Sequence, residues 1–270
     1  MFPLLTSPTM SHHHNRVLPL LPQSTRPSSR ASLGFVATSA LALVTAVVVS
    51  GCSKGEPAAA SNSAPVAGQI SAAPPQTGAD TDHTTAGTGL PTGYSAVFDH
   101  ADAKSTDVSY AEKEPGKWEV KTGPAHILFS PSDTAANKFI ASATFEQLEA
   151  PAHAEAFGVF IGGSNLSGPK IKYTYFIVRG DGMYMVKVRD GANTRTITNW
   201  TASPAIPKQD AKGKGLYGIR VDVRDNVASV SVNGAPVTTI AGKDAPLNGI
   251  AGVRINHNLH LVVTPVTVVR

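Results

Sequence analysis

Apolar and polar side chains alternate in short runs along the chain from residue 94 onward. In the run 216–223 (LYGIRVDV), every second residue from Tyr217 to Val223 is apolar. This period of two predicts a β-strand with one buried face, because successive side chains of a strand point to opposite sides. Comparable runs predict further strands at 118–120, 125–129, 138–148, 155–161, 172–178, 183–189, 194–200, 227–232, 236–240, 249–256 and 259–268.

Glycine, aspartate and asparagine stand between these runs, as at 180–182 (GDG) and 224–226 (RDN). Asn233-Gly234 is the strongest hairpin signal, because both residue types tolerate a positive φ. About a dozen strands with turns every 8–12 residues, and no convincing helical period, predict an all-β fold. We expect a two-sheet antiparallel sandwich of the jelly-roll type over residues 94–270.

The chain begins with a different pattern. Residues 31–51 carry no charge, and Arg26 and Arg30 precede them. Basic residues, an apolar run and then small residues are the layout of a secretory signal. The run ends in Val49-Ser-Gly-Cys52, which resembles a bacterial lipobox and implies cleavage before Cys52 and lipidation of its thiol. We therefore predict a lipoprotein signal peptide over 1–51, with an atypically long leader; an uncleaved membrane-spanning helix is the alternative.

Residues 52–93 are dominated by Ala, Ser, Thr, Gly and Pro and contain no aromatic residue. Such a segment buries too little apolar surface to offset the entropy of ordering it. We expect a disordered linker between a lipid anchor at Cys52 and a folded head. The protein is then exported by the general pathway to the bacterial cell envelope, and to the outer membrane in an organism with two membranes.

The net charge of +4 does not indicate a nucleic-acid partner. Arg16, Arg26 and Arg30 are the only charged residues before Cys52. Without these three, the 23 basic residues of the chain become 20, against 19 acidic ones. The basic balance therefore belongs to the predicted signal segment, and no nucleic-acid binding is expected of the head.

Several motifs of the head form a familiar series, namely WEVKTG at 118–123, GVFIGG at 158–163, YFIVRGDG at 175–182, VSVNG at 230–234 and GVRINHNL at 252–259. They resemble the concanavalin A-like (laminin G-like) jelly rolls of bacterial secreted proteins, including domains similar to the 3-keto-disaccharide hydrolase family. The resemblance covers nearly all of residues 94–270. It implies a jelly-roll fold that hosts lectins, adhesion modules and glycosidases alike.

The carboxylates of the head do not form a clear catalytic pair. Glycosidases place two of them close together on one face, whereas Asp222 is the only carboxylate well inside a predicted strand. No Ser-His-Asp order, metal-ligand cluster or phosphate loop is visible, and we predict neither a cofactor nor a metal. Asp99 and Asp102 are the only candidate calcium ligands that the sequence suggests. A glycoside hydrolase is implied only by the family resemblance.

Binding is the function that the polar and aromatic residues favour. Sugar sites combine flat aromatic surfaces for C–H faces with planar polar groups for hydroxyls. The candidate ligand-binding residues are Tyr173, Tyr175, Trp200, Arg254, Asn256 and His257.

Two structural questions stay open in the sequence. Tyr173 and Tyr175 share one face of their strand, and either face fits the core. Arg254 either faces outward or is buried beside a carboxylate such as Asp222. The function we expect is glycan binding by a membrane-anchored lipoprotein; a glycoside hydrolase and a structural or protein-interaction module of the envelope are the alternatives.

Overall fold

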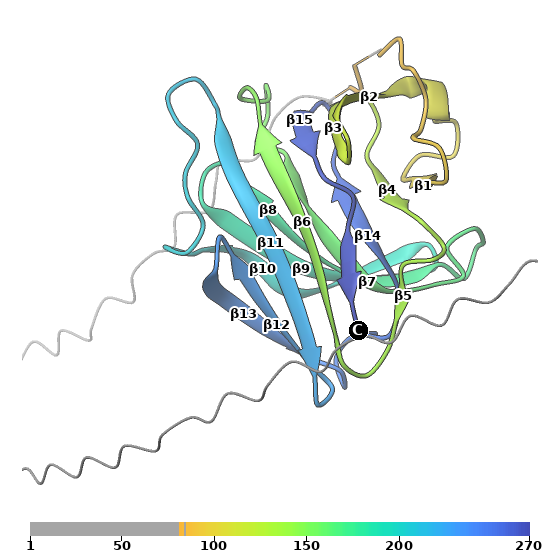
Figure 1. The fold of residues 1–270 in the computed structure, drawn as a ribbon, viewed down its shortest axis with the longest axis vertical. Coiled ribbons are helices and arrows are strands. Elements are labelled where there is room, and N and C mark those ends of the chain that lie inside the picture. Colours follow the sequence, from red (N-terminus) through yellow and green to blue (C-terminus); the bar gives the residue numbers. More distant parts are fainter. Residues whose placement is uncertain (1–80, 84) are drawn as a thin grey trace, which may run out of the picture. The chain divides into compact units, whose positions relative to one another are not determined.

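The structure is a computed structural model, and it describes residues 81–83 and 85–270. Two antiparallel sheets face each other (Figure 1). Sheet I has the strand order β1 (Ser95–Phe98), β4 (His126–Phe129), β14 (Gly249–Ile255), β7 (Ala156–Ser164), β8 (Lys172–Arg179), β9 (Met183–Asp190) and β10 (Asn193–Ala202), with β5 (Thr134–Ala135) also paired to β14.

Sheet II has the order β13 (Ala235–Ala241), β12 (Val227–Val232), β11 (Gly215–Arg224), β6 (Phe139–Gln147), β15 (His260–Val263), β3 (Lys117–Thr122) and β2 (Val108–Glu114), with β16 (Thr267–Val269) paired to β6. A single 3-10 turn, η1 (Ser105–Asp107), is the only helical element in the described part of the chain. The predicted all-β, two-sheet antiparallel sandwich is confirmed.

The main core lies between the two sheets and follows the predicted alternation. On β11, the apolar positions Tyr217, Ile219, Val221 and Val223 are buried in this core. The turns also match the sequence, because Asn233 and Gly234 between β12 and β13 have φ values of 49° and 82°. Positive φ at both central residues suits the right-handed twist of the strands that a two-residue hairpin joins.

Residues before β1 contact the sandwich, although the sequence assigns them to the linker. The amide of Gly87 donates to the carbonyl of Thr106 at 3.0 Å, and Gly89 forms a parallel bridge with Ser109 on β2. Asn258 binds the backbone of residues 81 and 83. Within the described residues, the predicted linker thus contacts the sandwich from residue 81 onward. Cys52, the predicted signal 1–51 and the linker up to residue 80 lie outside the described residues.

The edge strand β10 of sheet I is irregular. β10 pairs with β9 along one side, and its register shifts twice, between Thr196 and Thr198 and between Thr198 and Thr201. No helix within the described residues is long and apolar enough to cross a membrane.

A fully buried histidine, His126, is the first residue of β4. His126 has no exposed surface, and its Nε2 lies 2.6 Å from the hydroxyl of Tyr110. Its Nδ1 lies 3.1 Å from the carbonyl oxygen of Pro124, which can only accept. Nδ1 therefore carries the proton, and Nε2 accepts from Tyr110. Burial lowers the pKa of His126 from 6.5 to about 4, so the ring is neutral at pH 7.

We predict that His126 makes folding pH-dependent. Between pH 6.5 and 4 the unfolded chain binds a proton at this ring that the folded chain does not, so stability falls as the pH falls. The loss is about 1.4 kcal/mol per pH unit, or roughly 3 kcal/mol in all. Urea unfolding at several pH values measures the free energy of unfolding. Its decrease with falling pH should be smaller in the double variant Tyr110→Phe/His126→Phe than in the parent protein. An equal decrease in both proteins would exclude His126 as the source of the pH dependence.

Candidate functional site

The outer face of sheet I carries a second apolar cluster, separate from the main core. On β8, Phe176 and Val178 point into the main core, whereas Tyr173, Tyr175 and Ile177 point to the outer face. The cluster consists of Ile127, Phe129, Ala156, Phe160, Leu166, Ile171, Tyr173, Tyr175, Ile177 and Met185. The two tyrosines are only 3% and 7% exposed. They face away from the main core, as a sugar platform requires, but they are packed rather than open.

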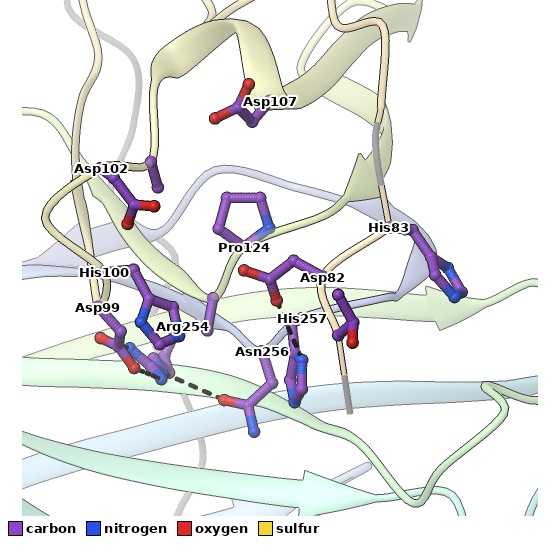
Figure 2. Close-up of a pocket in the computed structure, with 13 residues that line it drawn as sticks. Asp82, His83, Asp99, His100, Asp102, Asp107, Pro124, Arg254, Asn256 and His257 are labelled. Carbon is purple, nitrogen blue, oxygen red and sulfur yellow. Dashed lines mark hydrogen bonds and ion pairs between the residues drawn. The ribbon is translucent and has the colours of Figure 1, made fainter. Parts of the chain in front are cut away.

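Two clefts lie in this region, and the second of them is lined by residues of the cluster. The first cleft has a volume of about 690 Å³ and the second about 620 Å³. Asp99, His100 and Ala103, from the loop after β1, line both of them. The second cleft is lined mainly by apolar and aromatic residues, including Phe98, Phe129, Leu166, Ile171 and Tyr173, together with the charged side chains of Asp99 and Arg189. The first cleft is polar, and Figure 2 shows its lining residues. One loop therefore separates a polar cleft from an apolar one.

A bidentate ion pair between Arg254 and Asp99 lies where the two clefts meet. Arg254 Nη1 donates to Asp99 Oδ1 at 2.8 Å, and Nη2 donates to Oδ2 at 2.5 Å (Figure 2). The guanidinium also lies 5.7 Å from the ring centroid of Tyr175. Burial raises the pKa of Asp99, but the hydrogen bonds and charge of Arg254 outweigh it and hold that pKa below its ordinary value. Burial raises the pKa of Tyr175 to about 12, so this phenol keeps its proton.

A chain of hydrogen bonds continues from the ion pair through Asn256, which lines the first cleft, to Glu155. Arg254 Nε donates to Asn256 Oδ1 at 3.3 Å, and Asn256 Nδ2 donates to Glu155 Oε2 at 3.2 Å. His257 lies between two carboxylates, with Nε2 3.0 Å from Glu155 and Nδ1 3.2 Å from Asp82. The predicted residues Arg254, Asn256 and His257 are thus brought together in one connected polar network.

The first cleft is rich in carboxylates. Asp82, Asp99, Asp102 and Asp107 line it, and Arg254 is the only arginine or lysine in its lining (Figure 2). Because Arg254 is already paired with Asp99, the remaining charge is negative. A ligand with carboxylate groups would be repelled here, whereas neutral hydroxyls or amino groups would be accepted. The described residues contain no group of three or more His, Cys, Asp or Glu side chains arranged to hold a metal ion.

Trp200 lies apart from the two clefts, at the β10 side of the same apolar cluster. Its ring stacks on the guanidinium of Arg179, whose Cζ lies 4.3 Å from the ring centroid. Arg179 in turn pairs with Asp181. The indole is half-buried, and it lines neither cleft. The structure therefore places Trp200 against the cluster of Tyr173 and Tyr175, but separates it from the first cleft, which Arg254, Asn256 and His257 line.

Sequence reasoning missed the acidic partners in this site. The sequence indicates Asp99 only as a candidate calcium ligand, yet in the structure it neutralises Arg254, 155 positions away. Asp222, the carboxylate that the sequence suggests for Arg254, instead pairs with Arg220 and Arg224 on the exposed face of β11. No sequence feature indicates Glu155 or Asp82 as partners of His257, because no motif and no strand alternation connects them to it.

Comparisons with known proteins leave the family open. The sequence matches no protein-family model and no curated protein. Among solved structures, it resembles the carbohydrate-binding module CBM66 from Bacillus subtilis (11% identity, 66% of this chain and 96% of that chain, TM-score 0.48). It also resembles a glycoside hydrolase family 16 endo-glucanase from Bacteroides ovatus (7% identity, 65% and 94%, TM-score 0.47) and sheep galectin-11 (12% identity, 50% and 92%, TM-score 0.37). Similarity at this level assigns no function.

We predict that Arg254 is required for stability. Arg254→Met leaves the carboxylate of Asp99 without its partner, and removing one member of a buried pair costs about 3–5 kcal/mol. Because the Asp99 side chain is 33% exposed, we expect the lower end of that range. Asp99→Asn/Arg254→Met should recover part of the loss. Urea unfolding at pH 7 measures these changes.

The matched control is Arg220→Met, which breaks an exposed ion pair with Asp222. It should change stability by less than about 1 kcal/mol. If the two arginine variants are equally stable, the Asp99–Arg254 pair does not hold the site together.

Proposed function

We propose that the protein binds a neutral or amino-substituted glycan across the two clefts on the outer face of sheet I. The observation that carries the proposal is the pairing of one polar and one apolar cleft along a shared wall. A sugar ring has the same two sides, with hydroxyls at its edges and C–H groups on its faces. Fixed polar groups beside aromatic and apolar walls are the general chemistry of such sites.

The rigidity of the polar groups supports this proposal. Asp99 and Asn256 each hold Arg254, and Glu155 holds both Asn256 and His257. Side chains already fixed by their neighbours lose little entropy when a ligand binds, which favours affinity. The negative first cleft favours neutral or amino sugars over uronic acids.

The test is binding of the full chain to three oligosaccharide classes, namely neutral glucans, chitosan oligomers and oligo-uronates. We expect measurable affinity for a neutral or amino oligomer and none for the uronates. His100 is exposed and lines both clefts. His100→Ala should weaken binding about tenfold, the effect of one lost hydrogen bond, and should leave the melting temperature unchanged.

Asp225→Asn, on the remote β11–β12 turn, is the control and should bind like the parent. If His100→Ala binds the oligomer as tightly as the parent protein does, the glycan site does not lie in these two clefts. Binding to none of the three classes would favour a structural or protein-interaction module of the envelope.

A glycoside hydrolase is the second candidate, favoured by the imidazole of His257 between the carboxylates of Asp82 and Glu155. Titratable groups in contact beside a sugar-sized cleft suit general acid–base chemistry. New reducing ends that appear with the parent protein but not with Glu155→Gln would support hydrolysis. An unchanged oligosaccharide would support binding alone.

We further propose that a lipid on Cys52 anchors the head to the cell envelope. The lipobox-like Val49-Ser-Gly-Cys52 after an uncharged apolar run supports this proposal. Cells fed a palmitate analogue should label the parent protein and not Cys52→Ser, because only the thiol accepts the lipid. Equal labelling of both proteins would contradict lipidation at Cys52, and membrane fractionation would then show how the protein is held.

A further inference from the structure

Arg189 is the only arginine or lysine in the lining of the second cleft. It lies on β9, directly after Val188, which is buried in the main core. Because successive side chains of a strand point to opposite sides, Arg189 points to the outer face of sheet I. It faces Tyr173 across the β8–β9 pair, and Tyr173 lines the same cleft. A guanidinium therefore lies beside the aromatic and apolar walls of this cleft.

Most of the donors of this guanidinium are unused. Nε of Arg189 donates to the main-chain carbonyl of Gly191 at 2.5 Å, and this is its one hydrogen bond to the described residues. The N–H groups on Nη1 and Nη2 have no acceptor. They are not sealed in the protein, because the only buried side-chain N and O atoms without a partner in the described residues belong to Gln147 and Tyr217. The Nη atoms of Arg189 are therefore open to a ligand.

The charges around Arg189 favour a neutral acceptor over an anion. Burial raises the pKa of Asp99, but the hydrogen bonds and charge of Arg254 and the charge of Arg189 hold that pKa below its ordinary value. Arg189 thus acts on a carboxylate that already has a partner. The two clefts together are lined by four aspartates and two arginines, namely Asp82, Asp99, Asp102, Asp107, Arg189 and Arg254. An anionic ligand would meet a net negative charge across the whole site.

Among the substituents that sugar rings carry, the acetamido group suits these surroundings best. A protonated amine can only donate, and the positive charge of Arg189 would repel it. A hydroxyl can accept, but it has no apolar part to contact walls such as Phe98, Leu166 and Ile171. An acetamido group is neutral and has both a carbonyl oxygen for the guanidinium and a methyl group for the apolar walls.

We propose that the second cleft binds the acetamido group of an N-acetylated amino sugar, whose carbonyl oxygen accepts from the Nη atoms of Arg189. This inference rests on the proposed glycan binding and names the substituent that the site selects. The cleft volume of about 620 Å³ lies within the roughly 300–1,000 Å³ of small-molecule sites, so a substituted ring has room. Arg189 is then the residue that determines specificity, and the first cleft binds ring hydroxyls.

The test compares three methyl glycosides that differ only at C2, in the full chain and by nuclear magnetic resonance. They are methyl β-D-glucopyranoside, methyl β-D-glucosaminide and methyl N-acetyl-β-D-glucosaminide. The Nε–H signal of Arg189 reports the second cleft, and the side-chain amide of Asn256 reports the first. We expect the N-acetylated glycoside to shift the Arg189 signal and to bind about tenfold more tightly than the glucoside, the effect of one hydrogen bond to a charged donor.

Arg189→Met removes the guanidinium and keeps an apolar side chain. It should bind the N-acetylated glycoside only as tightly as the glucoside, and its affinity for the glucoside should equal that of the parent protein. The matched control is Arg195→Met. Arg195, on the neighbouring strand β10, also donates to a main-chain carbonyl, that of Asp244, but it lines neither cleft. This control should keep the full preference for the N-acetylated glycoside.

Equal binding of the N-acetylated glycoside and the glucoside by the parent protein would overturn the acetamido subsite and leave the glycan site standing. A preference that survives in Arg189→Met would do the same. If Arg189→Met does not fold, the parent protein decides, because an Arg189 signal that the N-acetylated glycoside leaves in place overturns the subsite. If neither reporter responds to any of the three glycosides, the subsite is overturned together with the glycan site on which it rests.

Discussion

The central strands of sheet I are buried on both faces, and the arrangement of the site follows from this constraint. One face packs on sheet II, and the other carries the second apolar cluster. β7 is buried over its whole length except Ser164, and β8 is buried except at its two ends. Space on the outer face is tight. At Gly252, a Cβ would lie 2.5 Å from the ring of Phe160 and 2.9 Å from Phe129.

A charge placed on such a face needs a partner of its own. Arg254 lies on the outer face of β14, where water cannot reach most of its guanidinium, and Asp99 supplies the opposite charge from the end of β1. The pair fixes the loop after β1 against sheet I, and that loop forms the wall shared by the two clefts. The ion pair that allows the arginine to be buried therefore also sets the shape of the clefts.

The sequence predicted what depends on local pattern. Alternation on 216–223 and the Asn233-Gly234 turn led directly to β11 and its neighbouring hairpins. The orientation of Tyr173 and Tyr175 was not predictable, because a strand buried on both faces has no polar side to reveal its direction. The partner of Arg254 was not predictable either, because a contact across 155 positions leaves no trace in local spacing.

The edges of the two sheets bear on how the molecule avoids aggregation. An exposed edge strand offers unpaired amides and carbonyls on which another chain can add a strand. The contacts of Gly87 and Gly89 lie along the β2 side of sheet II, so the last linker residues cover that edge. On sheet I, the two register shifts and the charged Arg195 make β10 irregular and polar. The last residues of the predicted tether therefore also leave less of the β2 edge open to a strand from another chain.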